Sequence, residues 1–93
     1  MLSSLVYAED PSIKAVPEEG AVPLSVSFEV KTEEPITSYA WDFNGDGKTD
    51  STEAMPTFTY TLDGAYIASV SMVTEAGEAR NATMTITART AMT

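Results

Sequence analysis

The sequence predicts an all-β sandwich, and three observations support this prediction. Apolar residues recur at every second position in several short segments, which is the spacing of a strand that buries one face. Thr, Val, Ile and aromatic residues dominate these segments, as is typical of pleated, half-buried strands. No window shows the apolar spacing of a capped amphipathic helix. At least six short strands are therefore expected.

The expected strands follow one another along the chain with turn residues between them. The first is expected around residues 12–16. The inward-facing residues of the later strands are Leu24, Val26, Phe28 and Val30; Tyr39, Trp41 and Phe43; Phe58 and Tyr60; Tyr66, Ala68, Val70 and Met72; and Ala82, Met84, Ile86 and Ala88. Turns rich in Pro, Gly, Asp and Glu are expected at 17–23, 33–35, 62–64 and 75–78.

Length and composition limit the possible functions. The 93 residues, 43% of them hydrophobic, suit one globular domain, expected over residues 10–90 with short tails at 1–9 and 91–93. Fourteen acidic and five basic residues give a net charge of −9, which argues against binding to nucleic acid or to anionic lipid. No apolar run is long enough to cross a bilayer, so no membrane insertion is expected.

Catalysis is not expected either. The chain has neither histidine nor cysteine, so the commonest general base and the thiolate nucleophile are both missing. The pairs Glu18-Glu19 and Glu33-Glu34 lie in predicted turns, where adjacent carboxylates usually serve solvation rather than a cleft.

Residues 42–53 (DFNGDGKTDSTE) fit the calcium-loop template D-x-[DN]-x-[DN]-G-x5-E at every specified position. Ca²⁺ takes about six to eight oxygen ligands, which such a loop supplies from alternate positions. The expected ligands are the side chains of Asp42, Asn44, Asp46, Asp50 and Glu53 and the backbone carbonyl of Lys48. Gly47 occupies the sixth position, where the chain turns sharply. The spacing predicts a structural Ca²⁺ ion.

The alternative interpretation of the same loop is a polar hairpin without metal. In that case Asp42, Asn44 and Asp46 would cap turns by accepting hydrogen bonds from nearby backbone amides. Two features favour this alternative: Thr49 stands where helical calcium hands carry an apolar residue, and strands rather than helices flank the loop.

Two aromatic residues indicate the kind of sandwich. Trp41 lies on the third full strand, where immunoglobulin-like folds place a core tryptophan. Tyr66 follows the Asp63-Gly64 turn and resembles a tyrosine corner, with Ala68 two residues further on. Alternation assigns seven of the eight aromatic residues to buried faces, so an exposed aromatic platform for a ligand is not expected.

Three segments carry a resemblance to a known family. Residues 39–47 (YAWDFNGDG) resemble the Y-x-W-D-F-G-D-G signature of PKD (polycystic kidney disease) domains. Residues 20–28 (GAVPLSVSF) resemble the family's G-x-x-P-L-x-V-x-F segment. Residues 58–60 and 64–66 resemble its H-x-Y and G-x-Y segments. Order and spacing hold over residues 11–88.

The chain departs from this pattern at three places. Asn44 is inserted between Phe43 and Gly45, and the insertion creates the calcium register. Phe58 stands where the family usually has histidine. The family is variable at the position of Glu53, so the resemblance gives that ligand no support.

The resemblance implies an immunoglobulin-like sandwich of about seven antiparallel strands in two sheets. It also implies a non-catalytic accessory module of a secreted or cell-surface protein, extracellular and next to a peptidase or polysaccharide hydrolase or in a surface layer. The expected partners are neighbouring domains, with the module acting as a calcium-stabilised spacer or in cell adhesion. The alternative is a module that binds protein or polysaccharide surfaces and docks a neighbouring enzyme onto collagen or polysaccharide.

Overall fold

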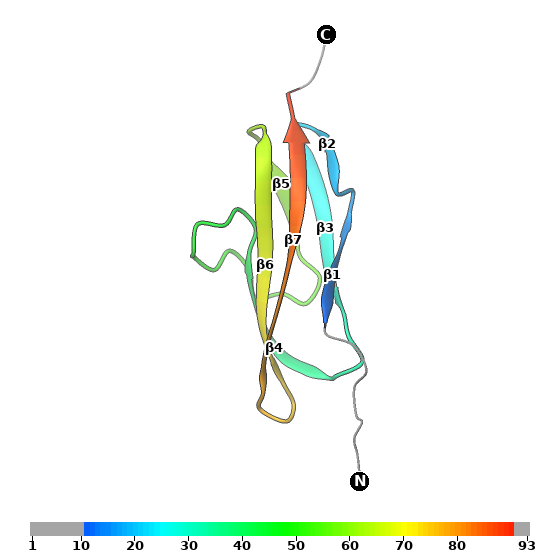
Figure 1. Ribbon diagram of the computed structural model, residues 1–93, viewed down its shortest axis with the longest axis vertical. Coiled ribbons are helices and arrows are strands. Elements are labelled where there is room, and N and C mark those ends of the chain that lie inside the picture. Colours follow the sequence, from blue (N-terminus) through cyan, green and yellow to red (C-terminus); the bar gives the residue numbers. More distant parts are fainter. Residues whose placement is uncertain (1–10, 91–93) are drawn as a thin grey trace.

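The computed structural model describes residues 11–90, and these form seven strands in two sheets packed face to face (Figure 1). The strands are β1 (Ser12–Val16), β2 (Glu19–Ala21), β3 (Leu24–Lys31), β4 (Ile36–Asp42), β5 (Thr57–Tyr60), β6 (Gly64–Thr74) and β7 (Ala79–Arg89). One sheet has the order β1-β3-β5 and the other β2-β7-β6-β4. The predicted all-β sandwich of about seven strands is confirmed. The tails expected at 1–9 and 91–93 lie outside the described residues.

β2 is the element that the sequence did not predict. It lies within residues 17–23, expected to be a turn, and it pairs parallel with β7, whereas the other strand pairs are antiparallel. Three residues are too few to show an alternating pattern, and the nearby prolines of the segment mark a turn. Hydrogen bonds from the Val22 amide to the Arg89 carbonyl (2.8 Å) and from the Thr87 amide to the Glu18 carbonyl (3.0 Å) fix its place.

The core follows the predicted faces. The side chains of Phe28, Trp41 and Phe43 are almost completely buried, and their ring centroids lie 4.8–5.8 Å apart. Tyr39 and Phe58, also predicted to face inward, are only partly buried. These contacts shield Trp41 from solvent completely, with 0% of its surface exposed.

The tyrosine corner predicted at Tyr66 is present. The Tyr66 hydroxyl donates a hydrogen bond to the carbonyl oxygen of Leu62, four residues upstream, at 2.6 Å. Gly64 makes the corner possible, because its φ of 151° lies in a region that side chains with a Cβ rarely adopt. Ala68, two residues after Tyr66, is fully buried.

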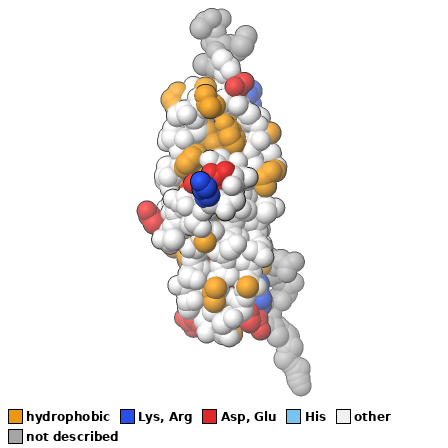
Figure 2. Space-filling view, turned by 90° about the vertical axis from the view of Figure 1, so that its left-hand side faces the viewer, with side chains coloured by type: hydrophobic (Ala, Val, Ile, Leu, Met, Phe, Trp, Pro, Cys, Tyr) orange, Lys and Arg blue, Asp and Glu red, His pale blue; other side chains and the backbone are white. Residues whose placement is uncertain are grey.

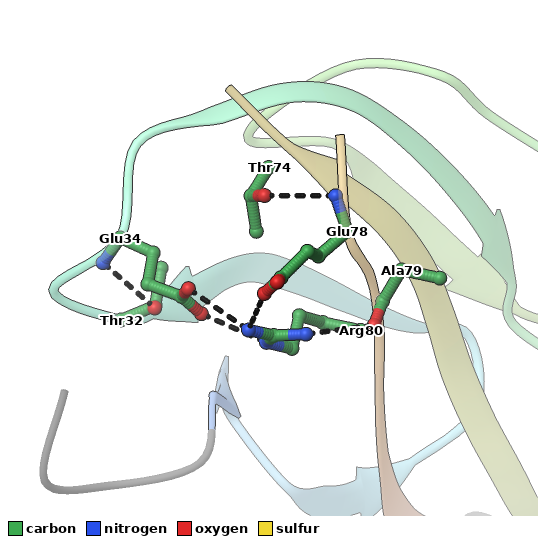
Figure 3. Close-up of polar contacts among 6 residues, drawn as sticks. All are labelled: Thr32, Glu34, Thr74, Glu78, Ala79 and Arg80. Atoms are coloured by element: carbon green, nitrogen blue, oxygen red, sulfur yellow. Dashed lines mark hydrogen bonds and ion pairs between the residues drawn. The ribbon is translucent and has the colours of Figure 1, made fainter. Parts of the chain in front are cut away.

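An ion-pair cluster around Arg80 joins the start of β7 to the segment between β3 and β4 (Figure 3). Arg80 Nε and Nη2 donate to the two carboxylate oxygens of Glu34 at 2.9 and 3.1 Å, and Nη2 also contacts Glu78. These hydrogen bonds, first to Glu34 and then to Glu78, raise the pKa of Arg80. The Glu34 side chain is only 8% exposed. The expectation that it is a solvated turn residue is therefore wrong, because a partner 46 residues away covers it.

Within residues 11–90 no helix is long and apolar enough to span a membrane.

Candidate metal centre

The predicted calcium loop connects β4 to β5 and projects from the edge of the sandwich (green in Figure 1). An isolated antiparallel bridge between Trp41 and Ser51 closes its base, with the Trp41 amide donating to the Ser51 carbonyl at 2.8 Å. The Asp50 amide donates in turn to the Trp41 carbonyl at 2.6 Å. The buried Trp41 ring adds a third tie, because its Nε1 donates to the Glu53 carbonyl at 2.7 Å. The loop is thus anchored to the core at both of its ends.

Three of the predicted ligands converge in this loop. Asp42, Asp46 and Asp50 each offer a carboxylate oxygen, and these atoms all lie within 4.8 Å of one another. Figure 2 shows acidic side chains gathered with a basic one on the part of the surface that faces the viewer there. Three like charges this close repel one another, and a bound divalent cation would remove that repulsion.

Asp42 organises the first half of the loop through its carboxylate. Oδ1 accepts hydrogen bonds from the amides of Gly45 (2.9 Å), Asn44 (3.3 Å) and Asp46 (3.3 Å), and Oδ2 accepts one from Gly47 (2.8 Å). Burial alone would raise the pKa of Asp42, but the backbone amides, led by Gly47, together outweigh it and hold the pKa below its usual value. Gly45 and Gly47 have φ values of 77° and 85°, which turn the chain around this carboxylate.

The remaining polar side chains of the loop bind backbone amides in the same way. Asp46 Oδ1 accepts from Lys48 at 2.9 Å, Asn44 Oδ1 accepts from Asp46 at 3.3 Å, and Asp50 Oδ2 accepts from Phe43 at 2.9 Å. These are the turn-capping bonds that the metal-free interpretation predicts. They also hold the carboxylates in place, and each carboxylate oxygen keeps lone pairs that such bonds do not use. The same arrangement of side chains therefore suits both the metal-free hairpin and a bound Ca²⁺ ion.

Glu53 and Lys48 take positions different from those of the three aspartates. The Glu53 carboxylate is not part of the group of converging carboxylates, and its residue is tied by its backbone to Trp41 and to the Ser51 hydroxyl. Lys48 is exposed, and its predicted contribution is a backbone carbonyl. Sequence reasoning missed the anchoring roles of Trp41 and Ser51, because a cross-loop bridge leaves no periodic signal.

Comparison with known proteins identifies the family of this chain. The sequence pattern of the PKD domain family matches residues 8–89. The chain belongs to the PKD domain family. The resemblance seen in residues 39–47 is thereby confirmed.

Relatives of this PKD domain include a segment of a protease. The chain is 37% identical over 68 residues to the pre-pro-metalloprotease PrtV of Vibrio cholerae, a match that covers 73% of this chain and 7% of that protein. The crystal structure of the PKD1 domain from the same metalloprotease superposes with a TM-score of 0.67 at 32% identity, covering 88% of this chain and 100% of the other.

A second kind of solved structure is also similar. It was described for the promiscuous specificity of carbohydrate-binding modules from the β-sandwich superfamily. Its TM-score is 0.70 at 26% identity, and the match covers 90% of this chain and 36% of the other. This PKD domain is therefore similar both to the PKD1 domain of a metalloprotease and to 36% of a chain whose structure was described for carbohydrate-binding modules.

Proposed function

We propose that this PKD domain is a non-catalytic accessory module of a larger, extracellular protein, in which residues 42–53 hold a structural Ca²⁺ ion. The module would act as a calcium-stabilised spacer or adhesion domain between neighbouring domains. The observation that carries the proposal is the convergence of Asp42, Asp46 and Asp50 within 4.8 Å. The accessory role is supported by the similarity to a segment that makes up only 7% of a metalloprotease.

The chemistry of the loop favours Ca²⁺ over other metals. The converging donors are carboxylate oxygens, and histidine and cysteine are absent from the chain, so the ligand set suits a hard cation. Asn44, the Lys48 carbonyl and Glu53 remain the proposed further ligands, and Glu53 requires a movement of its side chain toward the aspartates. An exposed loop of this kind binds Ca²⁺ with a Kd of about 10⁻⁴ to 10⁻³ M, the range of extracellular modules.

Thermal unfolding tests the metal site. The domain is treated with EDTA and then unfolded alone, with millimolar Ca²⁺ and with Mg²⁺. At about ten times the Kd, Ca²⁺ stabilises the fold by about 1.4 kcal/mol, which raises Tm by roughly 6–11 °C for a domain of this size. The Asp46→Asn variant should lose this response, whereas Asp63→Asn, an exposed aspartate outside the loop, should keep it. Equal responses in the two variants, or no response in the native domain, would show that the aspartates only cap turns.

A second candidate function is binding to polysaccharide, so that the module brings a neighbouring domain to an insoluble substrate. The observation that favours it is the similarity to the structure described for carbohydrate-binding modules. Retention of the domain on insoluble chitin or cellulose, with collagen as the protein alternative, distinguishes this function from that of a spacer.

A further inference from the structure

A shallow groove lies beside the metal loop, at the open edge of the sandwich. It encloses about 190 Å³ and is lined mainly by residues of β5, by the turn that follows and by Tyr66 of β6. Phe58, Leu62 and Tyr66 form its apolar walls, and Asn44 of the loop lies at its rim. Figure 2 shows hydrophobic side chains on the surface directly beside the charged loop. The groove is smaller than a drug-sized pocket of about 300–1,000 Å³ and is therefore suited to a single ring.

The groove exists because the first residues of β6 extend beyond the end of β4. The pairing of β4 with β6 ends at Asp42 opposite Ser69, so residues 64–68 of β6 have no strand beside them on that side. The chain leaves β4 there to form the loop. The aromatic side chains beneath this open edge, Phe58 and Tyr66, consequently remain partly exposed.

The aromatic walls are held rigidly. The Tyr60 hydroxyl donates to the Phe43 carbonyl at 2.7 Å, and the Tyr66 hydroxyl donates to the Leu62 carbonyl at 2.6 Å. Tyr60 lies between the other two rings, with centroids 4.8 Å from Phe58 and 4.6 Å from Tyr66. A ligand would therefore meet a surface that needs little ordering on binding.

The polar groups at the rim determine what kind of ligand fits. Asn44 Oδ1 accepts a hydrogen bond from Asp46, which leaves the Nδ2 hydrogens of its amide for a ligand. Thr61, exposed in the turn after β5, adds a hydroxyl. No lining residue is charged, and the net charge of −9 disfavours an anionic ligand. An apolar floor with a few hydrogen-bonding groups and no charge suits the face of a neutral sugar ring.

An added peptide strand fits this edge less well. A Cβ built on Gly45 would lie 3.5 Å from the Ile67 carbonyl oxygen, so the loop itself covers the edge of β6 at that residue. Only residues 64–66 stay uncovered, which is too short for the row of main-chain hydrogen bonds that strand addition requires.

We propose that this groove binds one neutral hexopyranose ring of a polysaccharide, with Phe58, Leu62 and Tyr66 against the ring face and Asn44 and Thr61 bonded to its hydroxyls. The proposal rests on the second candidate function and identifies the binding site for it. It shares Asn44 with the proposed metal site, which would use the Oδ1 atom of that side chain, whereas the sugar would use its Nδ2 group.

The test is a titration of the ¹⁵N-labelled domain by NMR. The probes are cellohexaose and chitohexaose, with N-acetyl-leucinamide as an apolar, non-sugar probe. Leu62→Ser removes an exposed groove side chain, and Met55→Ser is the matched control, because the two residues are 72% and 69% exposed and Met55 lies outside the groove. Neither change removes core contacts, so the amide spectrum reports at the same time that each variant is folded.

The expected result is a saturable shift of the amides of residues 58–62 by one of the hexasaccharides, with a millimolar Kd. Leu62→Ser should weaken that Kd at least fivefold, and Met55→Ser less than twofold. Sugar-induced shifts of amides on another face would show that the groove is not the binding site, but would still support the polysaccharide-binding function. Absence of shifts with both sugars, or shifts with the leucine amide alone, would overturn both.

Discussion

The two tyrosines of the groove provide a stringent test of the packing described above. Each hydroxyl donates one hydrogen bond to a backbone carbonyl, but the surroundings differ. The Tyr60 bond to Phe43 is buried, whereas the Tyr66 bond to Leu62 is exposed to water. Replacement of either tyrosine by phenylalanine removes a single oxygen atom and leaves the ring in place. The difference between the two variants therefore measures the effect of burial on one hydrogen bond.

The expected magnitudes follow from what each change leaves behind. In Tyr60→Phe the Phe43 carbonyl loses its partner where water cannot replace it, which costs about 1–3 kcal/mol. In Tyr66→Phe water reaches the Leu62 carbonyl, so only the net value of a hydrogen bond is lost, about 0.5–1.5 kcal/mol. At roughly 4–8 °C per kcal/mol for a domain of this size, Tyr60→Phe should lower Tm by about 8–16 °C for a cost near 2 kcal/mol.

Urea unfolding in EDTA, followed by the fluorescence of the single Trp41, gives both free energies of unfolding without any contribution from metal. Equal losses in the two variants, or a loss below about 0.5 kcal/mol for Tyr60→Phe, would refute the argument that burial of the Phe43 carbonyl makes the difference.

Two further changes test local features. The pKa of Asp42 is lowered in the folded state, so as the pH falls this carboxylate takes up a proton in the unfolded chain before it does so in the folded domain. The stabilisation that the Asp42 carboxylate gives the fold is therefore complete above about pH 4 and is lost as the pH falls further. Asp42→Asn should therefore be less stable than the native domain at pH 7 and lose less stability on acidification, and equal acid slopes in urea unfolding would contradict this. Gly20→Ala places a Cβ 2.7 Å from Leu24 Cδ1, the end of a flexible side chain, so a shift of the Leu24 side chain away from its preferred rotamer should cost about 0.5–1.5 kcal/mol. Adding Leu24→Val should recover part of that loss, and strictly additive losses would argue against the contact.

The sequence was sufficient for the features that repeat along a strand or match a fixed spacing. Alternation identified the buried faces of β3, β6 and β7, because each of these strands is long enough to show the period of two. The loop template placed Asp42, Asp46 and Asp50 together, because a chain that turns at Gly45 and Gly47 brings alternate positions to one side.

Features that depend on how separate strands end relative to one another could not be predicted. β2 is recognisable only by its pairing with β7, and Glu34 is covered only because Arg80 lies opposite it. The groove depends on β4 ending at Asp42 while β6 continues, and alternation alone counted Phe58 as a buried residue. Such offsets between strands are set by the tertiary register, and the local sequence carries no sign of them.

The parallel pairing of β2 with β7 has a mechanical consequence. The chain enters the sandwich through β1 at one pole and leaves through β7 at the other (Figure 1). Tension applied to these two ends pulls β2 and β7 in opposite directions along their own length, so their hydrogen bonds are loaded together in shear rather than opened one by one. The Arg89–Glu19 ion pair lies across the same interface at 2.9 Å. Single-molecule pulling should show a lower unfolding force when Val22→Pro removes the amide that donates to the Arg89 carbonyl, and an unchanged force would place the resistance in another pair of strands.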